Sequence, residues 1–208
     1  MIYKCSVHFY KRIQRIFITL NVNFFFGEQS YAFISKTFLK EYSFEKKMNG
    51  YIYQINVKPK TGNERGIPKL SVRSAYVAFQ GLEGDYNKYR MEKLINAGNP
   101  NKAVMLLPKE TIDALVQEDW PVLPGHLGEN ITTEGMTSFI VGRQYQLGEA
   151  QIEISELCNP CINLQVLPYI GKEKIKSFMQ TLLGRRGWYA RVIKEGTIEQ
   201  GNAISFLL

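Results

Sequence analysis

Histidine and cysteine are scarce in this sequence, whose 208 residues include two histidines and three cysteines. The histidines are His8 and His126, and neither stands at a zinc-finger spacing from the cysteine pair near residue 160. Three cysteines do not make a disulfide framework, and no convincing export signal is present. We therefore expect a protein of a reducing compartment, the cytoplasm, without a zinc site.

A strong charge of one sign is also missing from most of the chain. The formal net charge is +7, but residues 1–47 hold eight basic and three acidic residues and contribute +5 of it. Residues 48–208 hold eighteen basic and sixteen acidic residues, which leaves +2. A body so close to neutral does not indicate a broad nucleic-acid-binding face, so we expect no nucleic-acid partner.

Long uninterrupted apolar runs are the third missing feature. The most apolar stretch, residues 16–26, follows three basic residues as in a signal peptide, but two asparagines interrupt it and no small-residue cleavage site follows. It is too short to span a bilayer. Because a more regular sequence begins at Met48, we interpret residues 1–47 as an N-terminal appendage, either a mis-assigned translation start or a weak membrane anchor. Residues 48–208 are interpreted as one domain.

Short alternating segments separated by glycine turns dominate residues 48–208. Residues 51–57 alternate like a strand that places Tyr51, Tyr53 and Ile55 on one face, and residues 141–154 indicate a hairpin. A second hairpin is predicted from residue 185 to residue 206. Helical spacing of apolar residues follows Pro108 and recurs around residue 178. The fold class predicted is mainly β with a few helices, most simply a closed β-barrel.

Two of the cysteines stand three positions apart, directly after a predicted strand. Ile152 and Ile154 alternate with polar residues, and Pro160 cannot continue a strand ladder, so the strand should end near Leu157. This places Cys161 on a loop at the mouth of the barrel. A thiolate there could be a nucleophile, a sulfur carrier or a soft metal ligand. The C-x-x-C spacing alone does not choose between these roles and a pair of inert, buried thiols.

Four segments in order resemble the MOSC domain, the carboxy-terminal domain of molybdenum-cofactor sulfurases that also occurs as a stand-alone bacterial protein. They are GLEGD at residues 81–85, GENIT at 128–132, NPC at 159–161 and GRRGWYARV at 184–192. The likeness runs from about Gly50 to Phe206. It implies a closed barrel of the MOSC, pyruvate-kinase-barrel-like type. The cysteine shared by the family follows proline or arginine in this loop, which matches Cys161 and not Cys158.

The same resemblance implies the chemistry of the molybdenum cofactor, molybdopterin. Some family members are thought to carry sulfur toward the cofactor as a persulfide received from a pyridoxal-phosphate cysteine desulfurase. Others hold the cofactor and reduce N-hydroxylated compounds. Nothing in this sequence resembles a desulfurase domain, so pyridoxal phosphate would sit on a separate partner. A reductase would instead need redox partner proteins and a small-molecule substrate. An interpretation of another class is a non-catalytic binding module with a structural thiol.

The resemblance and the chemistry of the cofactor together point to site residues. Cys161 would be the catalytic residue and the metal ligand, because molybdenum favours a soft thiolate. The anionic, phosphate-bearing cofactor needs basic side chains and amide groups. The candidates are Lys102, Asn130, Arg185, Arg186 and Arg191.

Two of these assignments have open alternatives. Arg185 and Arg186 could equally be an exposed pair that complements the end of a helix. Cys158 is a departure from many family members. It could silence the site by forming a disulfide with Cys161, or it could resolve a persulfide.

Overall fold

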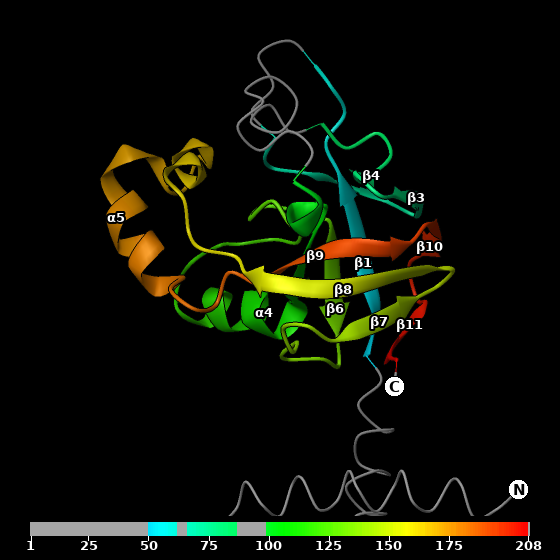
Figure 1. Ribbon diagram of the computed structural model, residues 1–208. Helices are drawn as coiled ribbons and strands as arrows, with labels where there is room; N and C mark the ends of the chain where they lie inside the picture. Colours follow the sequence, from blue (N-terminus) through cyan, green and yellow to red (C-terminus); the bar gives the residue numbers. More distant parts are fainter. Residues whose placement is uncertain (1–49, 62–65, 87–98, 208) are drawn as a thin grey trace, which may run out of the picture. The chain divides into compact units, whose positions relative to one another are not determined.

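The structure, a computed structural model, describes residues 50–61, 66–86 and 99–207 (Figure 1). The predictions for residues 1–47 and for the boundary at Met48 lie outside these residues. The strands are β1 Gly50–Val57, β2 Leu70–Val72, β3 Ser74–Ala78, β4 Gly81–Leu82, β5 Val104–Pro108, β6 Ile131–Glu134, β7 Gln144–Leu147, β8 Ala150–Leu157, β9 Trp188–Lys194, β10 Gly196–Glu199 and β11 Ala203–Phe206. The helices are η1 Pro100–Lys102, α4 Lys109–Gln117, η2 Ile162–Val166 and α5 Gly171–Thr181.

Seven of the strands close into a mixed barrel. Their order is β11-β7-β8-β9-β5-β6-β1, and β1 pairs back to β11 through Gly50 and Ile204. β5 and β6 run parallel, while the other neighbours among the described strands are antiparallel. β2 extends the sheet beside β1, and β10, β3 and β4 form a small second sheet. The predicted closed β-barrel is therefore confirmed.

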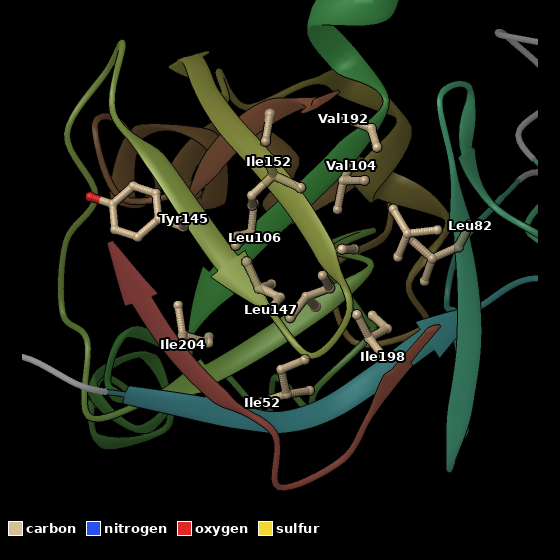
Figure 2. Close-up of a cluster of buried hydrophobic side chains, with 14 of the residues drawn as sticks. Ile52, Leu82, Val104, Leu106, Tyr145, Leu147, Ile152, Val192, Ile198 and Ile204 are labelled. Atoms are coloured by element: carbon tan, nitrogen blue, oxygen red, sulfur yellow. The ribbon is translucent and has the colours of Figure 1, made fainter. Parts of the chain in front are cut away.

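Apolar side chains from all around the barrel fill its interior (Figure 2). Ile52, Leu106 and Leu147 are fully buried there. Leu107 follows Leu106 along β5 and so points to the opposite side of the wall, where it joins a second apolar cluster with α4 and α5. Each such buried side chain stabilises the fold by roughly 1.5–3 kcal/mol. The barrel wall at β5 is thus covered by apolar side chains on both faces.

The strict alternation predicted for β1 is wrong. The register of β1 against β6 shifts between Ile52 and Gln54. This bulge lets Ile52 and Ile55 both enter the core, although they are three positions apart. Tyr51 and Tyr53 stay exposed. A β-bulge changes which face a side chain occupies, and the polarity pattern alone did not reveal it.

The two predicted hairpins had different outcomes. The first is confirmed, because β7 and β8 pair with Leu147 opposite Ala150. The second is wrong, because β9 pairs with β5 and β8, β10 pairs with β3, and β11 pairs with β7 and β1. Closure of the barrel separates these three consecutive strands and gives each a distant partner. No helix within the described residues is long and apolar enough to cross a membrane.

Candidate functional site

The two cysteines follow the end of β8, as predicted. β8 ends at Leu157, and the backbone N–H of Cys158 donates to the carbonyl of Gly187 at 2.9 Å. Cys161 is extended, with φ −136° and ψ 155°, and directly precedes η2. Both thiols are free, but Cys158 is 2% exposed while Cys161 is partly exposed. Cys161 is therefore the thiol of the pair that a reactant can reach more readily.

Cys158 lies against the outer face of the barrel wall. Its Sγ is 3.8 Å from the Sδ of Met105, whose neighbours Val104 and Leu106 point into the barrel. Tyr189, paired with Met105 across β5 and β9, brings its hydroxyl into hydrogen-bonding reach of Cys158. Burial raises the pKa of the Cys158 thiol, against the attraction of a nearby guanidinium. Cys158 is consequently a protonated thiol at neutral pH.

That guanidinium belongs to Arg186, which is only 6% exposed. Its Nη1 donates to the carbonyl of Asn159 at 2.7 Å, and its Nη2 donates to the carbonyl of Leu127 at 3.0 Å. Cys161 lies in electrostatic contact with the same group. Burial lowers the pKa of Arg186, but its interactions with Cys158, Cys161 and other neighbours raise it on balance. Arg186 therefore stays charged beside the accessible thiol.

The segment that supplies the Leu127 carbonyl is held by buried polar groups. The carboxylate of Glu129 accepts from the N–H of Gly125 and from the hydroxyl of Thr132. Burial raises the pKa of Glu129. These bonds fix the turn at residues 124–129 from within, as expected for a structural turn whose polar side chains cap backbone groups.

Asn130 belongs to the same network. Its Oδ1 accepts from the N–H of Met105 at 3.2 Å, and its Nδ2 donates to Asp85 at 2.8 Å. Asp85 also accepts from the Lys69 ammonium at 2.6 Å, and both side chains of that ion pair are 4% exposed. The amide of Asn130 is thus engaged inside the protein. Its predicted contact with a pterin stays a prediction.

Among the predicted basic residues, Arg186 is in contact with Cys161. Arg185 makes two bonds to Glu118, at 3.0 and 2.8 Å, on the surface. Arg191 pairs with Glu153 at 2.9 Å. These partners match the exposed, solvated alternative for Arg185 and give Arg191 a surface role along β9.

Lys102 lies near Cys158 through a contact with Tyr189. Its ammonium is 3.5 Å from Glu156 and lies over the ring of Tyr189 at 5.3 Å. It therefore covers the tyrosine that in turn contacts Cys158. Tyr189 was not among the sequence candidates. The alternation of β9 could have placed it outside the barrel, but its contact with a thiol depends on strand pairing.

The donor set fits a group that binds through one protein sulfur and carries negative charge. No cluster of three or more His, Cys, Asp or Glu side chains suited to a metal ion occurs among residues 50–61, 66–86 and 99–207. Among the described residues, Cys161 is the partly exposed free cysteine whose sulfur is available as a soft ligand. The Nε of Arg186 is buried without a hydrogen-bond partner in the described structure. These two groups are the ones in the described structure that could hold such a group.

Comparison with known proteins gives consistent matches. The family profile described as MOSC domain matches residues 93–205. The uncharacterized protein YflK of Bacillus subtilis is 31% identical over 150 residues, which cover 69% of this chain and 64% of YflK. A protein named reductase from Gibberella moniliformis is 36% identical over 86 residues, which cover 40% of this chain and 15% of that protein. The chain thus spans less than two thirds of either relative. The crystal structure of YiiM from Geobacillus stearothermophilus superposes with a TM-score of 0.58 at 28% identity, covering 76% of this chain and 75% of YiiM.

Proposed function

This chain belongs to the MOSC domain family, and from that membership and the site geometry we propose that it carries sulfur as a Cys161 persulfide in molybdenum-cofactor metabolism. The observation that supports this best is a partly exposed thiol beside the buried cation of Arg186. The thiolate is the reactive form of cysteine. A positive charge attracts an anionic sulfur more strongly in a buried site than in water.

The uptake step needs a sulfur donor but no oxidant. The Cys161 thiolate attacks the outer sulfur of a persulfide on a cysteine desulfurase. The donor's sulfur–sulfur bond breaks as the new one forms on Cys161, and the donor leaves as a thiolate. The proton of the donor persulfide passes to that thiolate, so Cys161 keeps an anionic terminal sulfur. Pyridoxal phosphate would remain on the desulfurase.

Incubation of the full chain with a cysteine desulfurase and free cysteine tests the carrier function. Intact-mass spectrometry should show a gain of one sulfur by the wild-type chain. The Cys161→Ser variant should gain none, because it lacks the attacking sulfur. An unmodified wild-type chain after complete turnover of the desulfurase would contradict the proposed function.

The residues that we propose would hold the cofactor itself are Cys161 and Arg186. When bound, the cofactor would supply a redox-active molybdenum, for which Cys161 offers a soft ligand and Arg186 an anion contact. Elemental analysis of full chains purified from a cofactor-producing host should find molybdenum with the wild type and less with Cys161→Ser. Equal molybdenum in the two proteins would exclude Cys161 as a ligand.

A second candidate function is reduction of N-hydroxylated compounds. The match over 86 residues to the relative named reductase favours this activity. This activity would require bound cofactor and separate electron-transfer partners. Turnover of a hydroxylamino-purine or an amidoxime with an artificial electron donor, together with no sulfur uptake, would favour the reductase. Absence of both activities and of metal would favour a non-catalytic binding module with a structural thiol.

A further inference from the structure

Arg186 is a buried cation held by uncharged groups. Two of its nitrogens, Nη1 and Nη2, donate to the backbone carbonyls of Asn159 and Leu127. The third, Nε, is buried and has no partner in the described structure. No carboxylate within the described residues forms a salt bridge with Arg186. Burying a charge without a counter-ion is costly, and so is burying an N–H without an acceptor. One anionic acceptor would remove both costs.

A group carried by Cys161 is best placed to supply that acceptor, because the Cys161 thiol is in electrostatic contact with the guanidinium. We propose that Arg186 is the positioning residue that holds the terminal, anionic sulfur of a Cys161 persulfide. This inference rests on the proposed carrier function and gives it a specificity-determining residue. The Cys161 sulfur is already in hydrogen-bonding reach of the guanidinium, and the added sulfur extends the side chain by one atom, which would let it also accept from the unpaired Nε–H.

The arrangement suits one anionic atom better than a phosphate group. Phosphate recognition usually engages several donors or a guanidinium fork. Here the carbonyls of Asn159 and Leu127 already take one N–H from each terminal nitrogen of Arg186. The neighbouring Arg185 is engaged by Glu118. The fork of Arg186 is therefore partly occupied, and its buried Nε–H is without an acceptor, which a single terminal sulfur would supply.

Chemical loading with inorganic polysulfide tests this inference without any partner protein. The thiolate of Cys161 attacks a sulfane sulfur, and the shortened polysulfide leaves as an anion, so the step is balanced. We load four full-length chains with sulfur, remove the reagent and incubate them without thiols: the wild type, Arg186→Gln, Arg186→Lys and the control Arg143→Gln. Arg143 serves as the control because its guanidinium lies over the ring of Phe206. Mass spectrometry of peptides then follows the lifetime of the persulfide on Cys161.

We expect the persulfide to be long-lived in the wild type and in Arg143→Gln. It should be lost much faster in Arg186→Gln, whose neutral, shorter amide lacks the charge and the guanidinium Nε–H. Arg186→Lys should retain part of the lifetime, because it keeps the charge but not the two carbonyl contacts. Equal lifetimes in the wild type and folded Arg186→Gln would overturn the inference while leaving the carrier function intact.

Loss of Arg186 could also unfold the chain, so a second measurement uses the wild type alone. Its melting temperature should rise on sulfur loading, because the terminal sulfur neutralises a buried cation. The Cys161→Ser chain treated in the same way should show no rise. A loaded wild type with an unchanged or lower melting temperature overturns the inference. A wild type that takes up no sulfur contradicts the carrier function itself, and the role of Arg186 falls with it.

Discussion

The two cysteines of the C-x-x-C segment differ in their surroundings. Cys158 is 2% exposed, touches Met105 and keeps its proton because burial raises its pKa. Cys161 is partly exposed and lies beside a guanidinium. Their spacing predicted neither difference. Cys158 is therefore a buried packing thiol, and Cys161 is the more accessible thiol, which we propose reacts.

Cys158 should matter for stability more than for sulfur uptake. Cys158→Ala leaves a small cavity and should lower the free energy of unfolding by about 1 kcal/mol. Cys158→Ser replaces the sulfur against Met105 with a smaller, more strongly hydrated hydroxyl, for which the nearby Tyr189 hydroxyl compensates only in part, and should cost more, about 1–3 kcal/mol. Urea unfolding of both variants measures this order. Full stability of Cys158→Ser would show that the site is wetter than its burial indicates.

His126 predicts a pH dependence of stability. Its Nδ1 accepts from the N–H of Leu123 at 3.3 Å and is 2.8 Å from the hydroxyl of Tyr169, so the ring is neutral. Burial lowers the pKa of His126 from 6.5. A depressed pKa contributes stability that is present above the unfolded value and is lost as pH falls through the folded value.

The wild type should therefore lose more stability than His126→Gln when the pH is lowered from about 7.5 to about 5. Thermal melts of both proteins at the two pH values give the comparison. The difference between the proteins cancels the titration of groups they share. An identical loss in both proteins would mean that His126 charges freely in the folded state.

The start of β9 holds Arg186 next to the cysteine segment and to β5. Gly187 follows Arg186 and has φ +91°, and a Cβ added there would be 2.1 Å from the carbonyl oxygen of Leu106 on β5. Its own carbonyl accepts from Cys158. One glycine thus lets β9 approach β5 closely and joins the two chain segments that carry Arg186 and the thiols.

Two glycine variants separate close approach from backbone strain. Gly187→Ala combines a left-handed φ with a backbone clash and should cost roughly 2–4 kcal/mol. Gly184→Ala has a similar φ of +71° but nothing within 4 Å of the added Cβ. It should cost only about 1–2 kcal/mol. Chemical unfolding of both variants provides the test, and equal costs would show that the contact with Leu106 relaxes freely.

The sequence was informative where local patterns decide the structure. The end of β8 at Leu157 followed from alternation and Pro160, and α5 followed from the spacing of Ile175 and Phe178. The sequence could not show that Arg186 is buried while its neighbour Arg185 pairs with Glu118 on the surface. The partners of Arg186 lie 27 and 59 positions away in the chain, and only the folded structure brings them together. The same holds for β9, β10 and β11, whose partners are set by closure of the barrel.

At the scale of the whole molecule, every strand of the barrel lies between Gly50 and Phe206. The ring closes through pairing of β1 with β11. All strands of the closed barrel thus come after Met48. We therefore continue to expect residues 48–208 to form one domain.

A chain beginning at Met48 should fold and melt close to the full chain. At this size roughly 1 kcal/mol moves the midpoint by about 2–4 °C, so a shift of a few degrees is the most we expect. Differential scanning calorimetry of both chains measures it. If the short chain is insoluble or melts far lower, residues 1–47 belong to the fold.

We propose Cys161, and not Cys158, as the reactive sulfur of this protein. The most direct test of this proposal is site-resolved mass spectrometry of full-length wild type, Cys158→Ala and Cys161→Ser after incubation with a cysteine desulfurase and cysteine. We expect an added sulfur on Cys161 in the wild type and in Cys158→Ala, and none in Cys161→Ser. Sulfur found on Cys158, or uptake that survives Cys161→Ser, would contradict it.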